Sequence, residues 1–121
     1  MFLAVGGFLF WASSYIDSGV YIKTLCKGAD DRRCVSLTFD DGPSLYYTPE
    51  ILDVLEKYNA KATFFVNGYQ LSSSKANILK RAIALGCEIG NHTESLANLP
   101  KLTPREIYDE IQSTNEKVRD L

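Results

Sequence analysis

The sequence predicts an α/β fold with parallel strands, and two observations lead to this prediction. Short apolar segments at 35–39, 62–66 and 87–90 are each followed by a segment with helical periodicity. Turn-forming residues separate the segments, as at Gly42-Pro43 and Asn67-Gly68. Repeated strand-then-helix units of this kind form a parallel sheet covered by helices.

The first unit begins with the strand Val35–Phe39, in which apolar residues alternate with Ser36 and Thr38. Gly42-Pro43 interrupts the strand pattern. A helix is expected next, with Thr48 as its N-cap and Pro49 at its first position. One face of this helix is apolar and is expected to point inward through Ile51, Leu52, Leu55 and Tyr58.

The second unit contains the apolar strand Ala62–Val66 and a helix over Lys75–Leu85, which Gly86 is expected to end as its C-cap. The inward face of this helix is expected to carry Ile78, Leu79, Ala82 and Ile83. The third unit has a short strand, Cys87–Gly90, and a helix that starts with the capping box Thr103-Pro104-Arg105-Glu106. Ile107, Ile111 and Val118 continue the apolar face of that helix.

The N-terminus has a different composition, because Met1 to Ala12 are almost all apolar. This run is shorter than the roughly 20 residues that span a bilayer. We therefore interpret residues 1–16 as a signal or membrane-anchor segment, with membrane association through residues 1–14. A buried core helix is the alternative, although Gly6-Gly7 disfavours it. Residues 17–34 read as a polar linker, and residues 35–121 as the globular domain.

Charge and cysteine content narrow the function classes. The net charge is −2 and no basic block is present, which argues against a nucleic-acid partner. Cys26, Cys34 and Cys87 fit no zinc-ribbon spacing. Either Cys26 and Cys34 close a short loop in an oxidising compartment or all three remain thiols, and the odd number favours the thiols.

Polar residues follow two of the predicted strands. Asp40-Asp41 comes after the first strand, and Asn91-His92-Thr93, which contains the single histidine of the chain, comes after the third. The carboxyl ends of parallel strands lie at one edge of a sheet, where functional residues gather. Two adjacent carboxylates repel each other unless a cation or a division of roles stabilises the pair. The pattern therefore indicates a metal site, with an Asx-turn and a histidine in a turn as the alternatives.

Three motifs in this order resemble a known family. Thr38-Phe39-Asp40-Asp41-Gly42-Pro43, Ala62-Thr63-Phe64-Phe65-Val66 and Glu88-Ile89-Gly90-Asn91-His92-Thr93 are similar to the polysaccharide deacetylases with a NodB homology domain, the family-four carbohydrate esterases. The resemblance implies the N-terminal half of a distorted (β/α) barrel over residues 35–121. It also implies an extracytoplasmic, secreted or membrane-anchored hydrolase that removes N-acetyl groups from polysaccharides such as chitin or peptidoglycan.

The resemblance also assigns roles to individual residues. Asp40 corresponds to the catalytic base, and Asp41 and His92 correspond to ligands of a divalent metal, for which zinc is the common choice. The family's next metal-binding histidine falls at Leu96, and Glu94 and Ser95 are the oxygen donors nearby. The family's later motifs, including a late histidine that acts as general acid, have no counterpart in these 121 residues. The alternative is therefore an inactive relative that binds glycan or has a structural role at the cell envelope.

Overall fold

The structure is a computed structural model that describes residues 2–15, 18–20 and 33–121. The chain divides into two compact units, Met1–Val35 and Ser36–Leu121, which are described separately. Most of the predicted linker 17–34, including Cys26, lies outside the described residues. The predicted fold is found in the second unit.

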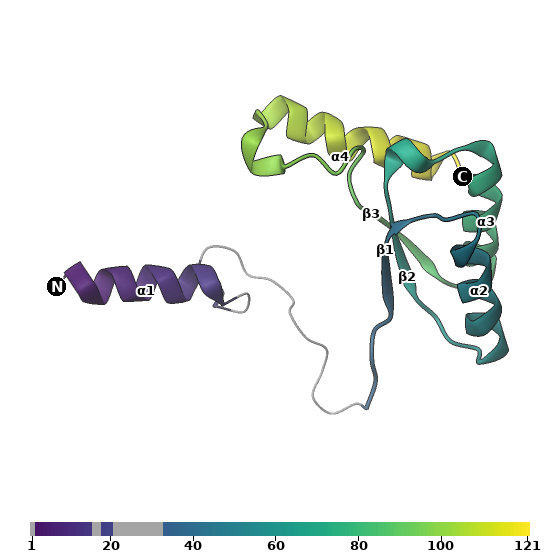
Figure 1. The fold of residues 1–121 in the computed structure, drawn as a ribbon, viewed down its shortest axis with the longest axis horizontal. Helices are drawn as coiled ribbons and strands as arrows, with labels where there is room; N and C mark the ends of the chain where they lie inside the picture. The colour runs from purple at the N-terminus through teal and green to yellow at the C-terminus, as the bar shows by residue number, and fades with distance from the viewer. Residues whose placement is uncertain (1, 16–17, 21–32) are drawn as a thin grey trace. The chain divides into compact units, whose positions relative to one another are not determined.

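A three-stranded parallel sheet forms the centre of the second unit (Figure 1). Its strands are β1 (Thr38–Gly42), β2 (Thr63–Val66) and β3 (Glu88–Asn91), in the order β1-β2-β3. Thr63 pairs with Thr38 of β1 and with Glu88 of β3, so the three strands begin at the same level. The predicted α/β class with parallel strands is confirmed.

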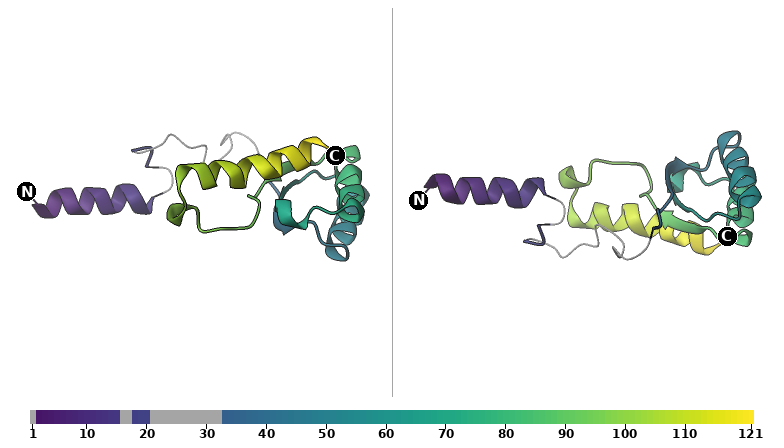
Figure 2. Two further views of the ribbon diagram at one scale, coloured as in Figure 1. Left: turned by 90° about the horizontal axis from the view of Figure 1, so that it is seen from above. Right: turned by 90° about the horizontal axis from the view of Figure 1, so that it is seen from below.

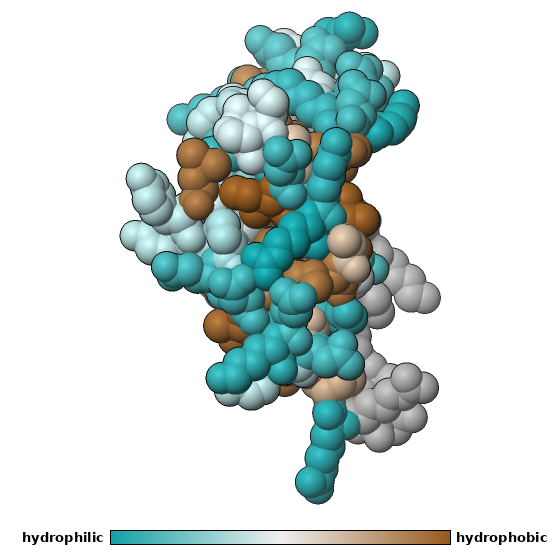
Figure 3. Space-filling model, turned by 90° about the vertical axis from the view of Figure 1, so that its right-hand side faces the viewer, coloured by the Kyte–Doolittle hydropathy of each residue, from teal (hydrophilic) through white to brown (hydrophobic). Residues whose placement is uncertain are grey.

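Helices α2 (Tyr47–Lys57) and α3 (Ser73–Ala84) pack side by side on one face of the sheet (Figure 1). The core between these helices and the sheet consists of Leu52, Leu55, Ala62, Phe64, Val66, Leu79, Ala82 and Cys87. The alternate residues of β2, Thr63 and Phe65, point to the other face and are half-buried. The outer face that carries α2 and α3 is largely hydrophilic, with small hydrophobic areas between polar side chains (Figure 3).

Helix α4 (Pro104–Arg119) contacts β3 and the short 3-10 helix η1 (Gly68–Gln70). The two views in Figure 2 show α4 running beside the sheet, after a long loop that contains η2 (Leu99–Lys101). The predicted capping box is confirmed, because Thr103 accepts a hydrogen bond from the backbone of Glu106 while the Glu106 side chain bonds back to Thr103. This cap fixes where α4 begins.

Two predicted boundaries are wrong. Strand β1 starts at Thr38 instead of Val35, because the ladder begins where β2 supplies a partner, and Val35 is 88% exposed. Helix α2 starts before Thr48, whose buried hydroxyl accepts a hydrogen bond from the Ser44 backbone. The Ser44 hydroxyl in turn accepts bonds from the N–H groups of Tyr46 and Tyr47 at the helix start.

Three residues expected on inward faces are instead exposed: Tyr58, Ile83 and Ile111.

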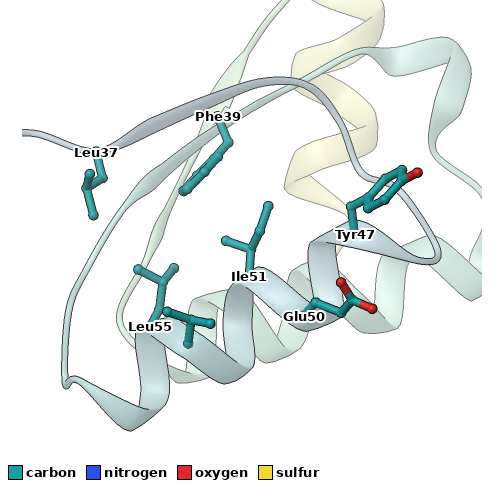
Figure 4. Close-up of a pocket in the computed structure, with 7 residues that line it drawn as sticks. Leu37, Phe39, Tyr47, Glu50, Ile51 and Leu55 are labelled. Atoms are coloured by element: carbon teal, nitrogen blue, oxygen red, sulfur yellow. The ribbon is translucent and has the colours of Figure 1, made fainter.

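A shallow apolar depression of about 440 Å³ lies between β1 and α2 (Figure 4). Leu37 and Phe39 line it from the strand side, and Ile51 and Leu55 line it from the helix. Tyr47 and Glu50 stand at its other end. Among the residues that the structure describes, β1 pairs only with β2, so this depression runs along an open sheet edge.

The first unit contains helix α1 (Phe2–Ser14), which covers the predicted apolar segment. It carries no acidic residue in its first turn and no basic residue in its last. Within the described parts of the chain, no helix has both the length and the apolar character needed to cross a membrane.

Candidate active site

The two adjacent acids occupy an irregular end of β1. Phe39 pairs with Phe64 and Gly42 with Val66, so β1 holds one more residue than β2 in this interval. Such a bulge changes the direction of the side chains beside it. Asp41 has a φ of 63°, in the left-handed region that non-glycine residues seldom adopt. Because of this irregularity, Asp40 and Asp41 line the same depression of about 350 Å³, although neighbouring residues of a regular strand face opposite sides.

His92 follows β3 directly and faces Asp41. Its Nε2 atom lies 3.3 Å from Oδ1 of Asp41, and both side chains remain accessible to solvent. The His92 backbone N–H donates to the carbonyl oxygen of Val66 at 2.9 Å, which holds this residue at the end of the sheet. The structure therefore brings Asp41 and the histidine together, as the order of strands predicted.

The apolar floor beside His92 is the ring of Phe65. The two ring centroids are 6.5 Å apart and the planes are inclined by 57°. Phe65 lies over Gly90 of β3, where an added Cβ would come within 2.4 Å of the ring. A glycine is therefore required in this strand so that the aromatic ring can reach the histidine.

Two donor atoms have a spacing that fits one cation. Two ligand atoms at about 2.0–2.1 Å from a tetrahedral zinc ion lie about 3.3 Å apart. The Asp41 Oδ1 and His92 Nε2 atoms have this separation, and a carboxylate with an imidazole is a suitable donor set. In the described part of the chain, however, no group of three His, Cys, Asp or Glu side chains could hold a metal ion. Catalytic zinc sites usually have three protein ligands, so the pair supplies a partial site.

The oxygen donors nearest to this pair in the sequence, Glu94 and Ser95, both form bonds with α4. The Glu94 carboxylate forms an ion pair with Lys117 and accepts a hydrogen bond from Thr114, both on α4. Ser95 donates to Glu110 of α4 from its hydroxyl at 2.6 Å and from its backbone at 2.8 Å. Both of these oxygen donors are therefore bound by α4.

The contacts between this loop and α4 also explain why residue 68 is a glycine. A Cβ on Gly68 would lie 1.9 Å from the Glu94 carboxylate and 2.4 Å from the Thr114 hydroxyl. The Gly68 carbonyl also accepts a hydrogen bond from Lys117 at 3.1 Å. Gly68 therefore leaves the space in which the Glu94–Lys117 pair joins the loop to α4.

Leu96 stands where the resemblance places a second histidine. It is 47% exposed and has a φ of 60°. Thr93, in the same loop, has a φ of 65°. A branched side chain in the left-handed region costs free energy, so the loop holds its shape against local preference.

Sequence reasoning missed two residues near the pair. Gln70 donates from Nε2 to the carbonyl oxygen of Asp41 at 2.9 Å. Asn67 is fully buried and donates from Nδ2 to the carbonyl oxygen of His92 at 2.9 Å. Asn67 was recognised only as the residue that ends a strand, and no local pattern distinguishes that role from a link between strands.

Most of the chain matches a known protein family. A family model described as polysaccharide deacetylase matches residues 27–121. A peptidoglycan-N-acetylglucosamine deacetylase of Bacillus cereus is 49% identical over 90 residues, covering 74% of this chain and 32% of the relative. A chitooligosaccharide deacetylase of Bradyrhizobium is 39% identical over 87 residues, covering 72% of this chain and 39% of the relative.

Solved structures show the same relationship. A family 4 acetyl xylan esterase from Clostridium thermocellum, in complex with a cobalt ion, matches with a TM-score of 0.68 and 42% identity. The match covers 70% of this chain and 42% of that one. The chain thus spans less than half the length of these relatives. This agrees with the prediction that its parallel sheet corresponds to part of a (β/α) barrel.

Proposed function

Because this chain belongs to the polysaccharide deacetylase family, we propose that it is part of a metal-dependent hydrolase that removes N-acetyl groups from polysaccharide. The observation that carries the proposal is the 3.3 Å approach of Asp41 Oδ1 and His92 Nε2, with the exposed carboxylate of Asp40 next to Asp41 in the chain. A carboxylate and an imidazole at this spacing, beside a second carboxylate, supply two ligands and a base.

Asp41, His92 and Asp40 each have a separate role in the proposed reaction. Asp41 Oδ1 and His92 Nε2 hold the cation, which we propose to be zinc or another divalent ion. When bound, such a cation lowers the pKa of water toward about 7 and polarises a carbonyl oxygen. Asp40 is exposed next to Asp41 and accepts a proton as general base. A separate base is needed because a carboxylate that binds the cation is less basic.

N-acetylated polysaccharide is the proposed substrate class. The names of two relatives state their substrates, which are peptidoglycan N-acetylglucosamine and chitooligosaccharide. Both substrates carry the acetamido group that the proposed reaction cleaves. We place the protein outside the cytoplasm for the same reason, with residues 1–16 as an export or anchor segment.

The apolar character of helix α1 supports this location. Val5, Phe8, Leu9 and Phe10 are all exposed on the helix surface. Exposed apolar side chains around a short helix are suited to a lipid or translocation environment. Fractionation of cells that express a tagged full chain tests this assignment. A product found entirely in the cytosol would count against the envelope location.

One observation favours the alternative of an inactive relative that binds glycan. Leu96 cannot donate a lone pair, and the described residues contain no third ligand that reaches the pair. Glycan binding that persists after metal removal would support this alternative. Release of acetate from N-acetylated oligosaccharide would exclude it.

The decisive test of the proposed site is the change Leu96→His. A third ligand should tighten zinc binding by orders of magnitude, measured by titration of the purified chain. Leu96→Asn is the matched control, because asparagine tolerates the left-handed backbone at this position without supplying an imidazole. Equal zinc affinities for the histidine and asparagine variants would contradict the assignment of position 96.

A further inference from the structure

Asn67 joins the two strand ends that carry the proposed metal ligands. It follows β2, the central strand, and its side chain is completely buried. Its backbone N–H donates to the carbonyl oxygen of Gly42, next to Asp41, at 3.2 Å. Its side-chain Nδ2 donates to the carbonyl oxygen of His92 at 2.9 Å. One residue therefore fixes the backbone on both sides of the site.

We propose that Asn67 is a positioning residue that sets the spacing between Asp41 and His92. The inference rests on the proposed function, since this spacing matters only if the two side chains share a cation. Asn67 does not contact the cation in this proposal. It acts through the backbone of the two ligands.

The unsatisfied end of the same amide supports a functional role. Among the described residues, no group forms a hydrogen bond with Asn67 Oδ1, although this atom is buried. A buried oxygen without a partner lowers stability. Leucine has the same number of side-chain heavy atoms with the same branching, and it would avoid this loss. An asparagine at this position is therefore explained by the bond that its Nδ2 makes to His92, and packing alone does not require it.

Backbone strain beside both ligands supports the same role. Asp41 and Thr93 have φ values of 63° and 65°, and Thr93 immediately follows His92. Residues held in this region return to ordinary conformations unless the surroundings hold them. Asn67 bonds to Gly42 on one side and to His92 on the other, which are the neighbours of the two strained residues.

The test replaces Asn67 by leucine in the full 121-residue chain. Asn67→Leu keeps the branched side-chain shape and the backbone N–H but removes the bond to His92. Since the chain has a single histidine, its imidazole signals in NMR spectra are unambiguous. In the metal-free protein we expect weaker cross-peaks between the rings of His92 and Phe65. We also expect cobalt binding to weaken by about tenfold, as for other groups that orient metal ligands.

A control variant separates positioning from a general loss of stability. Ala82→Gly destabilises α3 in the core, beside the start of β3 and at the end of that strand opposite His92, and should change neither the cross-peaks nor the affinity for cobalt. If Asn67→Leu does not fold, Asn67→Ala removes the same bond with no steric demand. Cross-peaks and cobalt affinity equal to those of the control would overturn the proposal. If the unmodified chain binds no cobalt, the proposed function fails, while the cross-peaks still decide whether Asn67 positions His92.

Discussion

Oδ1 of Asp41 lies 3.3 Å from Nε2 of His92, although β2 separates the strands that carry these two residues. Two strand spacings amount to about 10 Å, so side chains that projected straight from β1 and β3 would remain apart. The bulge in β1 and the left-handed backbone of Asp41 change the direction of that side chain and allow the approach. The site therefore depends on an irregular strand end.

The first prediction separates the roles of the two acids. In a complete domain that also carries Leu96→His, Asp41→Asn should lose most of the bound zinc, because it removes a charged ligand. Asp40→Asn should keep the zinc and lose its turnover of N-acetylated oligosaccharide, since a base need not bind the cation. Elemental analysis of the purified variants measures the zinc content. If Asp40→Asn is the variant that loses the ion, the roles are reversed.

Much of the fold could be predicted from local patterns, because local interactions determine those features. The capping box at Thr103 and the order of strands and helices were correct for this reason. The approach of Asp41 to His92 followed from topology, since parallel strands align their carboxyl ends. The bulge in β1 was not predictable, because it depends on the register with β2.

The direction of Glu94 could not be predicted either, for a similar reason. The carboxylate turns toward Lys117, which is far away in the sequence and belongs to α4. Asn67 has an equally distant partner in His92. Sequence reasoning therefore proposed Asp41 and His92, which the structure brings together, and missed Asn67, which binds the backbone of His92.

The second prediction concerns Gly90→Ala. The new Cβ would overlap the ring of Phe65, which must then move from its place beside His92. Overpacking of this kind should lower the free energy of unfolding by about 1–3 kcal/mol, measured by urea denaturation. Zinc binding should weaken as well. Adding Phe65→Leu to Gly90→Ala should restore part of the lost stability but not the zinc affinity. If the two changes in unfolding free energy instead add strictly, the two residues do not interact.

The third prediction is a dependence of stability on pH through Glu110. Hydrogen bonds from the Ser95 hydroxyl, and then from the Ser95 backbone, lower the pKa of Glu110 below its ordinary value. A carboxyl group with a lowered pKa in the folded state adds stability above its unfolded pKa, near 4.3. That stability is lost as the pH falls through the lower folded value.

Glu110→Gln should therefore show a smaller loss of unfolding free energy between neutral pH and pH 3 than the unmodified chain. Denaturation at a series of pH values measures the difference. Glu106, whose pKa is lowered by its bonds with Thr103, remains in both proteins and does not affect the comparison. Parallel curves for the two proteins would show that the Ser95–Glu110 contact does not contribute.

The last prediction is that the 121-residue chain self-associates through the open side of β1. Among the described residues, β1 has a partner strand on one side only, and the apolar depression along it exposes Leu37 and Val54. An unpaired edge beside apolar side chains favours association between copies. Sedimentation velocity should show species larger than the monomer at high concentration.

Leu37→Lys combined with Val54→Lys should reduce them, because charged side chains protect an edge. Tyr58→Lys, at an exposed position outside the depression, is the control and should leave association unchanged. A chain that stays monomeric and melts cooperatively would instead show that the three strand-helix units are stable with this edge open.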